Sequence, residues 1–415
     1  MYKKIILSIF LVLGFIPILV NASVGSLVKV GNKYYDSLAE AIANASENDV
    51  ISLISDVKLD DSIEINKKVN INLNGNDITA PEKVFLVEGG ELNLTGKGTI
   101  KETNPNYGAI MVKGSTDPND EEYSVVNVDK DITLEGWSGI FITHNNSKSY
   151  GAKVNFGGKI NAVNDTSGGT GIGIYVNGNI KDPENSPVVN ILDGAKITST
   201  GNGLYFAGYG EYNINEADIS GSESGIGIKS GILNIDGATV TGTGPDATPT
   251  PGYNDGIKAS GTAIQIESND GYAGEIELNI DDGRFISNNS NVIYEYIGKG
   301  NHSQVIALDI SGGTFESKKG KDVIRITDSL KQFHSNFISG GQYSSNPEEY
   351  LKSGYAAGLS NGKYEVIQST ILGVFSPEGN SNNAFGIIII TLISIISLGL
   401  LVYFNKTKIL NIIRN

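Results

Sequence analysis

The chain contains no cysteine, which excludes a disulfide scaffold, thiol catalysis and thiolate metal sites. Histidine is scarce too: His144, His302 and His334 lie far apart in or beside loops, without the spacing of metal ligands. We expect these histidines to be solvated or hydrogen-bonded. The acidic loop 117–122 lacks a defined calcium-ligand spacing, so we expect solvated charge there. The sequence predicts no metal site and no cofactor.

Positive charge is also in short supply. The chain has 46 acidic against 31 basic residues, and all the acidic residues lie between Ser23 and Asn383. Five basic residues lie outside that part, which leaves it 26 basic residues and a net charge of −20. Such a surface repels nucleic acid and favours solubility, so we exclude nucleic-acid binding.

Long apolar runs occur only near the two ends of the sequence. Residues 1–22 predict a signal peptide, with Lys3 and Lys4 before an apolar run and small residues before Ser23. Residues 384–404 are apolar and uncharged, and as a helix they would span roughly 31 Å, about one hydrocarbon core.

The flanks of the second run predict the topology. The tail 405–415 carries Lys406, Lys408 and Arg414, so the positive-inside rule places it in the cytoplasm. A polar spacer, 369–383, precedes the span. We therefore predict a single-pass protein of the cell membrane, with everything between the signal peptide and the span exported.

What the sequence has in abundance is repetition. Three short strand phrases recur in fixed order roughly ten times between residues 50 and 343, which is typical of the coils of a parallel β-solenoid. The first phrase is apolar-Asn-apolar, as in Ile71-Asn72-Leu73, Leu92-Asn93-Leu94, Val126-Asn127-Val128, Val154-Asn155-Phe156, Val189-Asn190-Ile191, Tyr212-Asn213-Ile214, Leu233-Asn234-Ile235 and Leu278-Asn279-Ile280, with Leu308-Asp309-Ile310 as an acidic version. The others are small-apolar-x-apolar, as in Gly173-Ile174-Tyr175-Val176, and a short phrase such as Gly158-Lys159-Ile160.

Side chains alternate along a strand, so the outer residues of each phrase should point inward and the middle one outward. We predict an all-β parallel β-helix of about ten coils. A cap, 23–49, should precede it, with an amphipathic helix at 34–47 over the open first coil. A C-terminal cap, 344–368, should follow, with a turn or short helix at 346–351 and a hairpin arm at 361–366.

Both ends of this region resemble a known group of proteins. The opening phrases Val30-Gly31-Asn32-Lys33-Tyr34, Ser37-Leu38-Ala39-Glu40-Ala41-Ile42 and Val50-Ile51-Ser52-Leu53 resemble right-handed parallel β-helix surface proteins of low-GC Gram-positive bacteria. The segment from Ile338-Ser339-Gly340-Gly341 to Asn361-Gly362-Lys363-Tyr364 is similar to their closing module. The resemblance implies a pectate-lyase-like fold at the cell surface, in a family with no settled activity.

Insertions are concentrated at one corner of the predicted coil. Most of the long ones follow the small-apolar-x-apolar strand, and a further one, 241–260, leaves from another corner. Insertions on one face of a repeat protein often mark the working face.

The outward positions provide the candidate binding residues. Met111, Phe141, Tyr175 and Tyr205 should form a stacked stripe on consecutive coils, able to stack on sugar rings or to anchor a protein partner. The alternative is that these side chains stack only on each other or lie under the corner loops. The outward Asn column is explained more simply as a ladder of stacked amides.

An enzyme of this fold needs a catalytic set on its surface. Asp236, Asp282, Arg284 and Asp309 are the candidates, since glycoside hydrolysis uses two carboxylates. However, Asp236 and Asp282 each precede a turn glycine, and the Asn-Thr-Asp, Gly-His-Gly and Arg-Ile-Lys phrases of polygalacturonases are absent.

The segment Ser376-Pro377-Glu378-Gly379-Asn380 lies where sortase substrates carry their sorting motif, but it lacks the threonine-glycine pair, so we favour simple membrane anchoring. We predict a non-catalytic, monomeric surface rod for display or binding, for example an adhesin for a glycan or for a protein on a host or neighbouring cell. The alternative is a carbohydrate-active lyase or glycoside hydrolase of the same fold.

Overall fold

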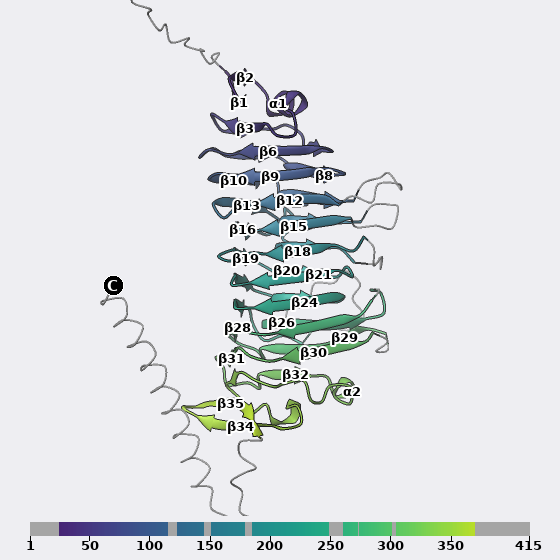
Figure 1. Cartoon of the computed structure of the whole chain (residues 1–415). Helices are drawn as coiled ribbons and strands as arrows, with labels where there is room; N and C mark the ends of the chain where they lie inside the picture. Colours follow the sequence, from purple (N-terminus) through teal and green to yellow (C-terminus); the bar gives the residue numbers. More distant parts are fainter. Residues whose placement is uncertain are drawn as a thin grey trace, which may run out of the picture.

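The computed structural model describes residues 25–114, 123–144, 151–178, 185–248, 260–272, 274–300 and 304–369. In these ranges the chain winds into a rod of stacked coils (Figure 1). Each coil contributes one strand in turn to sheets A, B and C, so strands three apart in the sequence are hydrogen-bonded neighbours. The predicted parallel β-helix is confirmed, and the 10 strands of sheet C agree with about ten coils.

The strands of each sheet follow in spatial order. Sheet A consists of β2 (Lys33–Tyr35), β1 (Val28–Val30), β3 (Val50–Leu53), β6 (Lys68–Asn72), β9 (Glu91–Thr95), β12 (Ser124–Val128), β15 (Ala152–Phe156), β18 (Val188–Ile191), β21 (Glu211–Asn215), β24 (Gly231–Asp236), β27 (Ile276–Ile280) and β30 (Ile306–Ile310). Sheet B consists of β34 (Tyr355–Ser360), β35 (Lys363–Gln368), β33 (Gln342–Tyr343), β31 (Thr314–Ser317), β28 (Gly283–Ser287), β25 (Ala238–Gly242), β22 (Asp218–Gly221), β19 (Lys196–Ser199), β16 (Lys159–Ala162), β13 (Ile132–Gly136), β10 (Gly98–Glu102), β7 (Ile78–Ala80) and β4 (Val57–Lys58). Sheet C consists of β32 (Ile324–Ile326), β29 (Ile293–Lys299), β26 (Thr262–Asn269), β23 (Ser224–Ile228), β20 (Asn202–Phe206), β17 (Ile172–Val176), β14 (Ser138–Ile142), β11 (Ile110–Lys113), β8 (Phe85–Glu88) and β5 (Ile63–Ile65).

The interior of the rod is one continuous apolar core. Burial alternates along the strands as predicted: Ile110 and Val112 are buried and Met111 between them is half-buried. The core cluster extends from Val28 to Val366 without a break. Aromatic rings stack within it from coil to coil, with centroids 4.8 Å apart for both Phe285–Phe315 and Phe315–Tyr343. The core is therefore built coil on coil, and each coil buries its neighbours.

The outward asparagines of sheet A form the predicted amide ladder. Each Nδ2 donates to the Oδ1 of the preceding coil at distances from 2.6 to 3.1 Å. The ladder begins at Asn70, which pairs with Asn93, whereas Asn72 of the first phrase lies opposite Thr95. The donors in order are Asn93, Asn127, Asn155, Asn190, Asn213, Asn234 and Asn279.

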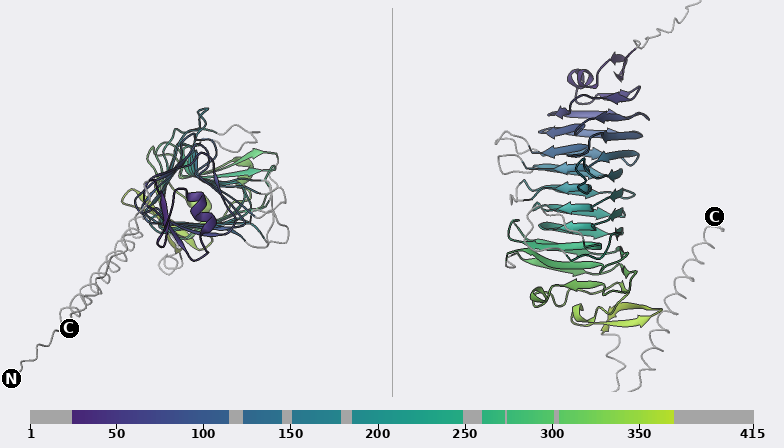
Figure 2. Two further views of the ribbon diagram at one scale, coloured as in Figure 1. Left: turned by 90° about the horizontal axis from the view of Figure 1, so that it is seen from above. Right: turned by 180° about the vertical axis from the view of Figure 1, so that it is seen from behind.

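The N-terminal end is covered by a helix, as predicted. Helix α1 (Leu38–Asn44) lies across the open end of the rod (Figure 2), and the Ser37 hydroxyl accepts the Glu40 N–H at 3.2 Å. The predicted start at Tyr34 is wrong. Tyr34 belongs to β2, which pairs antiparallel with β1. Strand β1 in turn pairs with β3, so the two strands cover the sheet edge that the first coil would otherwise expose.

The C-terminal end also has a cap. It contains a short helix, η1 (Glu348–Tyr350), and the antiparallel hairpin β34–β35, which turns at Asn361 and Gly362, both with positive φ. A further short helix that the sequence did not predict, α2 (Asp328–Lys331), follows the last strand of sheet C. No helix within the described ranges is long and apolar enough to cross a membrane. The predicted signal peptide, spacer, membrane span and basic tail lie outside these ranges, apart from Ser369.

The long connections follow the strands that the sequence predicted, although residues 115–122, 145–150, 179–184 and 249–259 within them lie outside the described ranges. They leave the ends of the sheet C strands β11, β14 and β17 and return to sheet A, which puts them at one corner of the coil. The loop that follows β25 leaves sheet B for sheet C at another corner.

Candidate functional site

The outer face of sheet C carries the predicted stripe in the predicted register. Its outward positions are paired from coil to coil in one unbroken column. Below Tyr205 the column continues through smaller and polar residues to an arginine. The members in order are Leu86, Met111, Phe141, Tyr175, Tyr205, Gly227, Gln265, Tyr294 and Arg325.

The aromatic members of the stripe are in contact. Phe141 and Tyr175 meet edge to face with centroids 4.9 Å apart, and Tyr175 stacks on Tyr205 at 5.1 Å. Trp137, the single tryptophan of the chain, adds a fourth ring beside them, 6.2 Å from Phe141 and 5.7 Å from Tyr175. We call Trp137, Phe141, Tyr175 and Tyr205 the ring cluster.

Trp137 is held in place by the corner between sheets B and C. Its indole N–H donates to the Thr170 carbonyl at 2.9 Å, and the Thr170 hydroxyl donates to Glu223 at 2.8 Å. Burial raises the pKa of the Glu223 carboxyl, and the Thr170 hydrogen bond opposes this shift. Sequence analysis missed Trp137; the signal was its place directly before the phrase Ser138-Gly139-Ile140.

Exposure divides the ring cluster. Trp137, Phe141 and Tyr175 are half-buried, whereas Tyr205 is only 2% exposed. Tyr272, from the connection after β26, packs against Tyr205, and their hydroxyls are 3.4 Å apart. Burial, together with neighbouring Tyr272 and Tyr175, holds the pKa of Tyr205 well above its usual value. The accessible rings are therefore those of Trp137, Phe141 and Tyr175, next to half-buried Met111.

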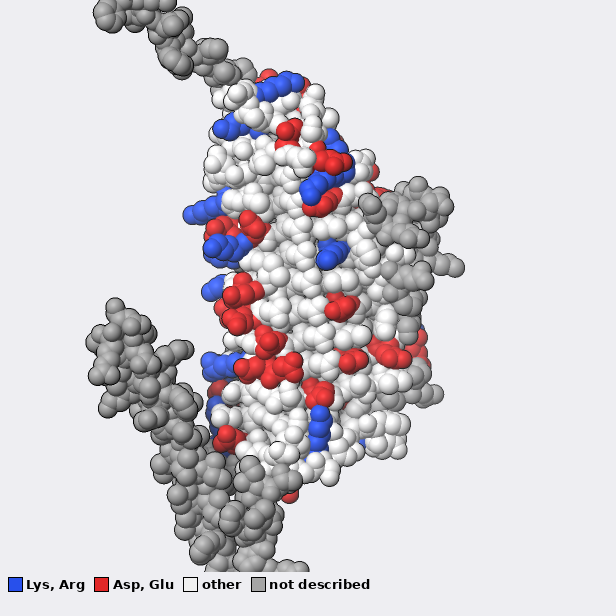
Figure 3. Space-filling model, in the orientation of Figure 1, with Lys and Arg blue, Asp and Glu red and all other residues white. Residues whose placement is uncertain are grey.

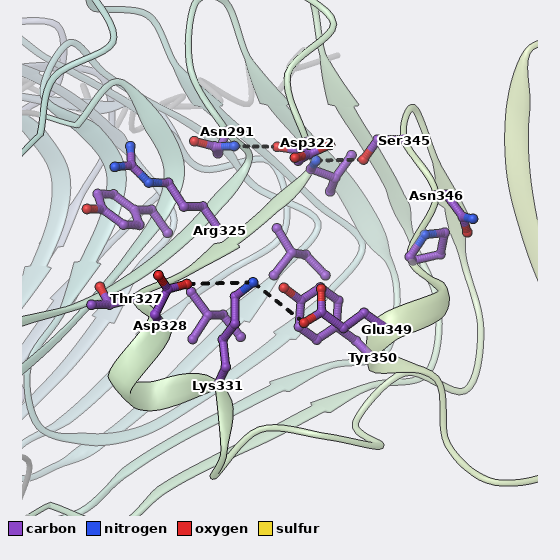
Figure 4. Close-up of a pocket in the computed structure, with 15 residues that line it drawn as sticks. Asn291, Asp322, Arg325, Thr327, Asp328, Lys331, Ser345, Asn346, Glu349 and Tyr350 are labelled. Atoms are coloured by element: carbon purple, nitrogen blue, oxygen red, sulfur yellow. Dashed lines mark hydrogen bonds and ion pairs between the residues drawn. The ribbon is translucent and has the colours of Figure 1, made fainter.

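The lower end of the same column opens into a cavity of about 580 Å³ between the last coil and the C-terminal cap (Figure 4). The Arg325 guanidinium lies 4.3 Å from the centroid of the Tyr294 ring. On the other side of the cavity Lys331 pairs with Asp328 at 3.9 Å and with Glu349 at 3.6 Å. The cavity thus combines a stacked arginine with two carboxylates that a single lysine bridges.

The proposed catalytic residues are not brought together as one set. Arg284 lies on sheet B and pairs with Glu316 at 3.3 Å, whereas Asp309 lies on sheet A and pairs with Lys352 of the cap at 2.8 Å. Asp282 accepts the N–H of Gly283 at 2.7 Å, as its expected turn role requires. Asp236 is an exposed residue at the end of β24. None of these four residues lines the cavity beside the C-terminal cap.

His334 lies in a loop, as expected, but it is buried and paired with a carboxylate rather than solvated. It is 5% exposed, and its Nε2 lies 2.8 Å from the Glu295 carboxylate, which points into the core between Ile266 and Ile326. Helix α2 carries the chain over the last coil and so turns His334 inward. His144 is half-buried after β14, and His302 lies outside the described residues. Within the described ranges no group of three or more His, Asp or Glu side chains is placed to hold a metal ion.

Comparisons with protein-family models, with curated proteins and with solved structures return no match. The parallel β-helix rests on the strand pairing itself, and the resemblance to Gram-positive surface proteins stays a prediction.

Proposed function

We propose that this protein is a non-catalytic binding rod displayed on a bacterial cell surface. In this proposal residues 1–22 direct export, residues 384–404 anchor the chain in the cell membrane, and the β-helix, right-handed and monomeric, projects outward. The observation that carries the proposal is the half-exposed part of the ring cluster on the outer face of sheet C.

The other two outer faces support this choice of surface. Sheet A turns its amide ladder outward, and those side chains are occupied by one another. Charged side chains gather along the edge of the rod on the sheet B side (Figure 3). Several are paired between coils, as in Lys101–Glu135 at 3.0 Å and Lys196–Asp218 at 3.5 Å. Among the described residues, only sheet C carries adjacent aromatic side chains that are partly exposed.

A carbohydrate is the ligand class that these rings fit best. Partly exposed aromatic rings on successive coils offer apolar surface to successive sugar rings, and each contact contributes roughly 0.5–1.5 kcal/mol beyond the burial of area. A protein on a host or neighbouring cell is the other partner that such a surface fits, which would make the rod an adhesin.

The binding test uses the full-length chain in detergent on a glycan array. We expect Phe141→Ala with Tyr175→Ala to weaken binding to any glycan hit at least about tenfold, equivalent to roughly 1.4 kcal/mol. Lys159→Ala with Lys196→Ala is the matched control, because these residues are exposed on sheet B of neighbouring coils. Equal affinity of the two double variants would rule out the ring cluster as the binding surface.

The topology test uses intact cells that carry a tag after Asn415. Protease added outside should remove the β-helix and spare the tag, because Lys406, Lys408 and Arg414 favour a cytoplasmic tail. Loss of the tag together with the β-helix would overturn the topology. Release of the protein by a wall-degrading enzyme alone would show that the sorting-like segment 376–380 is processed.

A lyase or glycoside hydrolase is the alternative, and the C-terminal cavity is the feature that favours it. Arg325, Asp322, Asp328 and Glu349 all line that cavity. An enzyme there would cleave an acidic polysaccharide, and Arg325→Ala would abolish the cleavage. Incubation with a panel of uronic-acid polymers, followed by product chromatography, tests it. Cleavage lost in Arg325→Ala but kept in Phe141→Ala with Tyr175→Ala would favour the enzyme over the rod.

A further inference from the structure

A second feature of sheet C lies below the ring cluster and is closed to solvent. Lys229 follows β23 directly, and Glu267 and Asn269 lie at the end of β26, the neighbouring strand. All three point to the outer side of the sheet, like Gly227 and Gln265 before them. Each of the three is only 1% exposed.

One carboxylate oxygen joins the other two side chains. Oε1 of Glu267 lies 2.8 Å from the Lys229 Nζ and accepts the Asn269 Nδ2–H at 2.7 Å. Its second oxygen, Oε2, accepts the Tyr296 hydroxyl at 2.5 Å. A buried carboxyl group that contacts an amine and a carboxamide through the same atom is placed to carry a proton from one nitrogen to the other.

The carboxamide of Asn269 is fixed and polarised. Its Oδ1 accepts the Gly271 N–H at 2.9 Å, and its own backbone N–H donates to Gln304 at 2.9 Å. Opposite this end of β26, the neighbouring strand β29 carries one extra residue, Gly298, between the partners of Ser268 and Asn269. A backbone N–H on the amide oxygen is the donor that would stabilise negative charge there.

Aromatic rings wall off the amine. The Lys229 Nζ lies 4.9 Å from the centroid of the Tyr272 ring and 5.6 Å from that of Tyr205. The amine is thus enclosed together with the Glu267 carboxylate, which is the group placed to take its proton, and the neutral amine is the nucleophilic form.

We propose that Lys229 and Asn269 condense into an intramolecular amide cross-link. After Glu267 takes a proton from Nζ, the neutral amine attacks Cγ of Asn269, and Gly271 N–H stabilises the charge that develops on Oδ1. Glu267 gives its proton to Nδ2, the Cγ–Nδ2 bond breaks and ammonia leaves. The surplus proton on Nζ returns to Glu267, and an Nζ–Cγ amide remains. No oxidant, metal or co-reactant is consumed.

Peptide mapping of the full-length chain tests the cross-link. Without it, trypsin cleaves after Lys229 and gives peptides 197–229, 230–258 and 259–284. With it, the modified Lys229 resists cleavage, so 197–258 appears joined to 259–284, lighter than the two together by one ammonia. Three separate peptides of full mass would overturn the proposal. So would loss of ammonia confined to an unjoined 259–284, because that result indicates a cyclised asparagine.

Variants then assign the roles. Lys229→Arg, Glu267→Gln and Asn269→Ala should each give only unlinked peptides, whereas Lys159→Arg on the exposed face of sheet B should leave the link intact. Full linkage in Glu267→Gln would overturn the role of the carboxyl group. The wild-type map alone decides whether the link exists, even if a variant fails to fold.

Discussion

The outer faces of sheets A and C run side by side along the same coils, yet they differ in one respect. On sheet A the same amide recurs in every rung from Asn70 to Asn279, and each is bonded to the next. On sheet C the outward residue changes at almost every coil, from Met111 through rings to Arg325. The outward residue of sheet A is the same in each coil because it hydrogen-bonds to its copy in the neighbouring coil. The outward residue of sheet C has no such constraint and can be selected for binding, and for this reason we place the candidate site on sheet C.

The largest loss of stability should come from placing a charged side chain at an inward position on one strand of sheet A. Ile235 is 2% exposed in the core, and neighbouring Asn234 is a ladder rung. Ile235→Asp would bury an unpaired charge, so we expect a loss of several kcal/mol in the free energy of unfolding, or no folded protein. Asn234→Asp should cost far less, about 1–2 kcal/mol, because the partly exposed carboxylate still accepts from Asn279 and lacks a donor only toward the Asn213 amide oxygen. Thermal and urea melts that ranked the two variants in reverse order would contradict the assignment of faces.

Removal of a central rung should have the next largest effect. Asn155→Ala leaves Asn190 without its acceptor and Asn127 without its donor, so we expect a loss of about 1–3 kcal/mol in urea unfolding. Lys153→Ala is the control, since this exposed residue lies on the same strand and outer face, and it should cost less than about 0.5 kcal/mol. Equal losses in the two variants would mean that the ladder contributes nothing specific. Glycan binding should change in neither.

The dependence of stability on alkaline pH should differ between variants of sheet C and variants of sheet A. The folded protein keeps the Tyr205 proton above the pKa at which the unfolded chain releases it, so stability should fall as the pH rises past about 10. Tyr205→Phe removes that contribution, and its curve should be shallower by at most about 1.4 kcal/mol per pH unit. Asn155→Ala should keep the wild-type slope, because the ladder amides do not titrate. A wild-type slope in Tyr205→Phe would contradict the buried position of this ring.

The smallest effect is expected where the ladder ends. Asp309 occupies the next rung position but pairs with Lys352 at 2.8 Å, and both side chains are partly exposed. Asp309→Asn exchanges an ion pair for an amide that can extend the ladder, so the change should stay within about 1 kcal/mol and shrink with added salt. Lys352→Ala in the same melts separates the loss of the ion pair from the gain of a rung. A loss above 2 kcal/mol would assign the ion pair a larger role in holding the cap.

The coil register could be predicted because it repeats. In a phrase such as Leu233-Asn234-Ile235 the alternation of apolar and polar residues predicts which side chains point inward, and the same alternation recurs in the next coil. At the first coil the pattern is ambiguous, because Val69-Asn70-Ile71 and Ile71-Asn72-Leu73 both fit it, and only pairing with the following coil shows that Asn70 is the rung. The start of helix α1 was mispredicted for a similar reason. By sequence Tyr34 fits a helix face equally well, and only its antiparallel pairing with Lys29 of β1 shows that it belongs to a strand.

The site was predicted only in part, because its contacts come from outside the repeat. Tyr175 and Tyr205 occupy equivalent positions in the sequence, and what separates them is Tyr272, which folds back from a connection 67 residues beyond Tyr205. The Lys229, Glu267 and Asn269 cluster has no phrase of its own. Contacts made by the irregular connections do not recur from coil to coil, so they cannot be predicted from the repeat in the sequence.

The ladder has a consequence for how such a rod changes its length. The rung from Asn213 to Asn234 spans 21 residues and the next, to Asn279, spans 45, yet both close with the same amide bond at 2.9 Å. Every rung is therefore interchangeable with every other, whatever its coil carries on the opposite side. A gene that duplicates or deletes one whole coil leaves the neighbouring coils with a matching partner. The reach of the rod can then be lengthened or shortened in steps of about 4.8 Å without redesign of either cap.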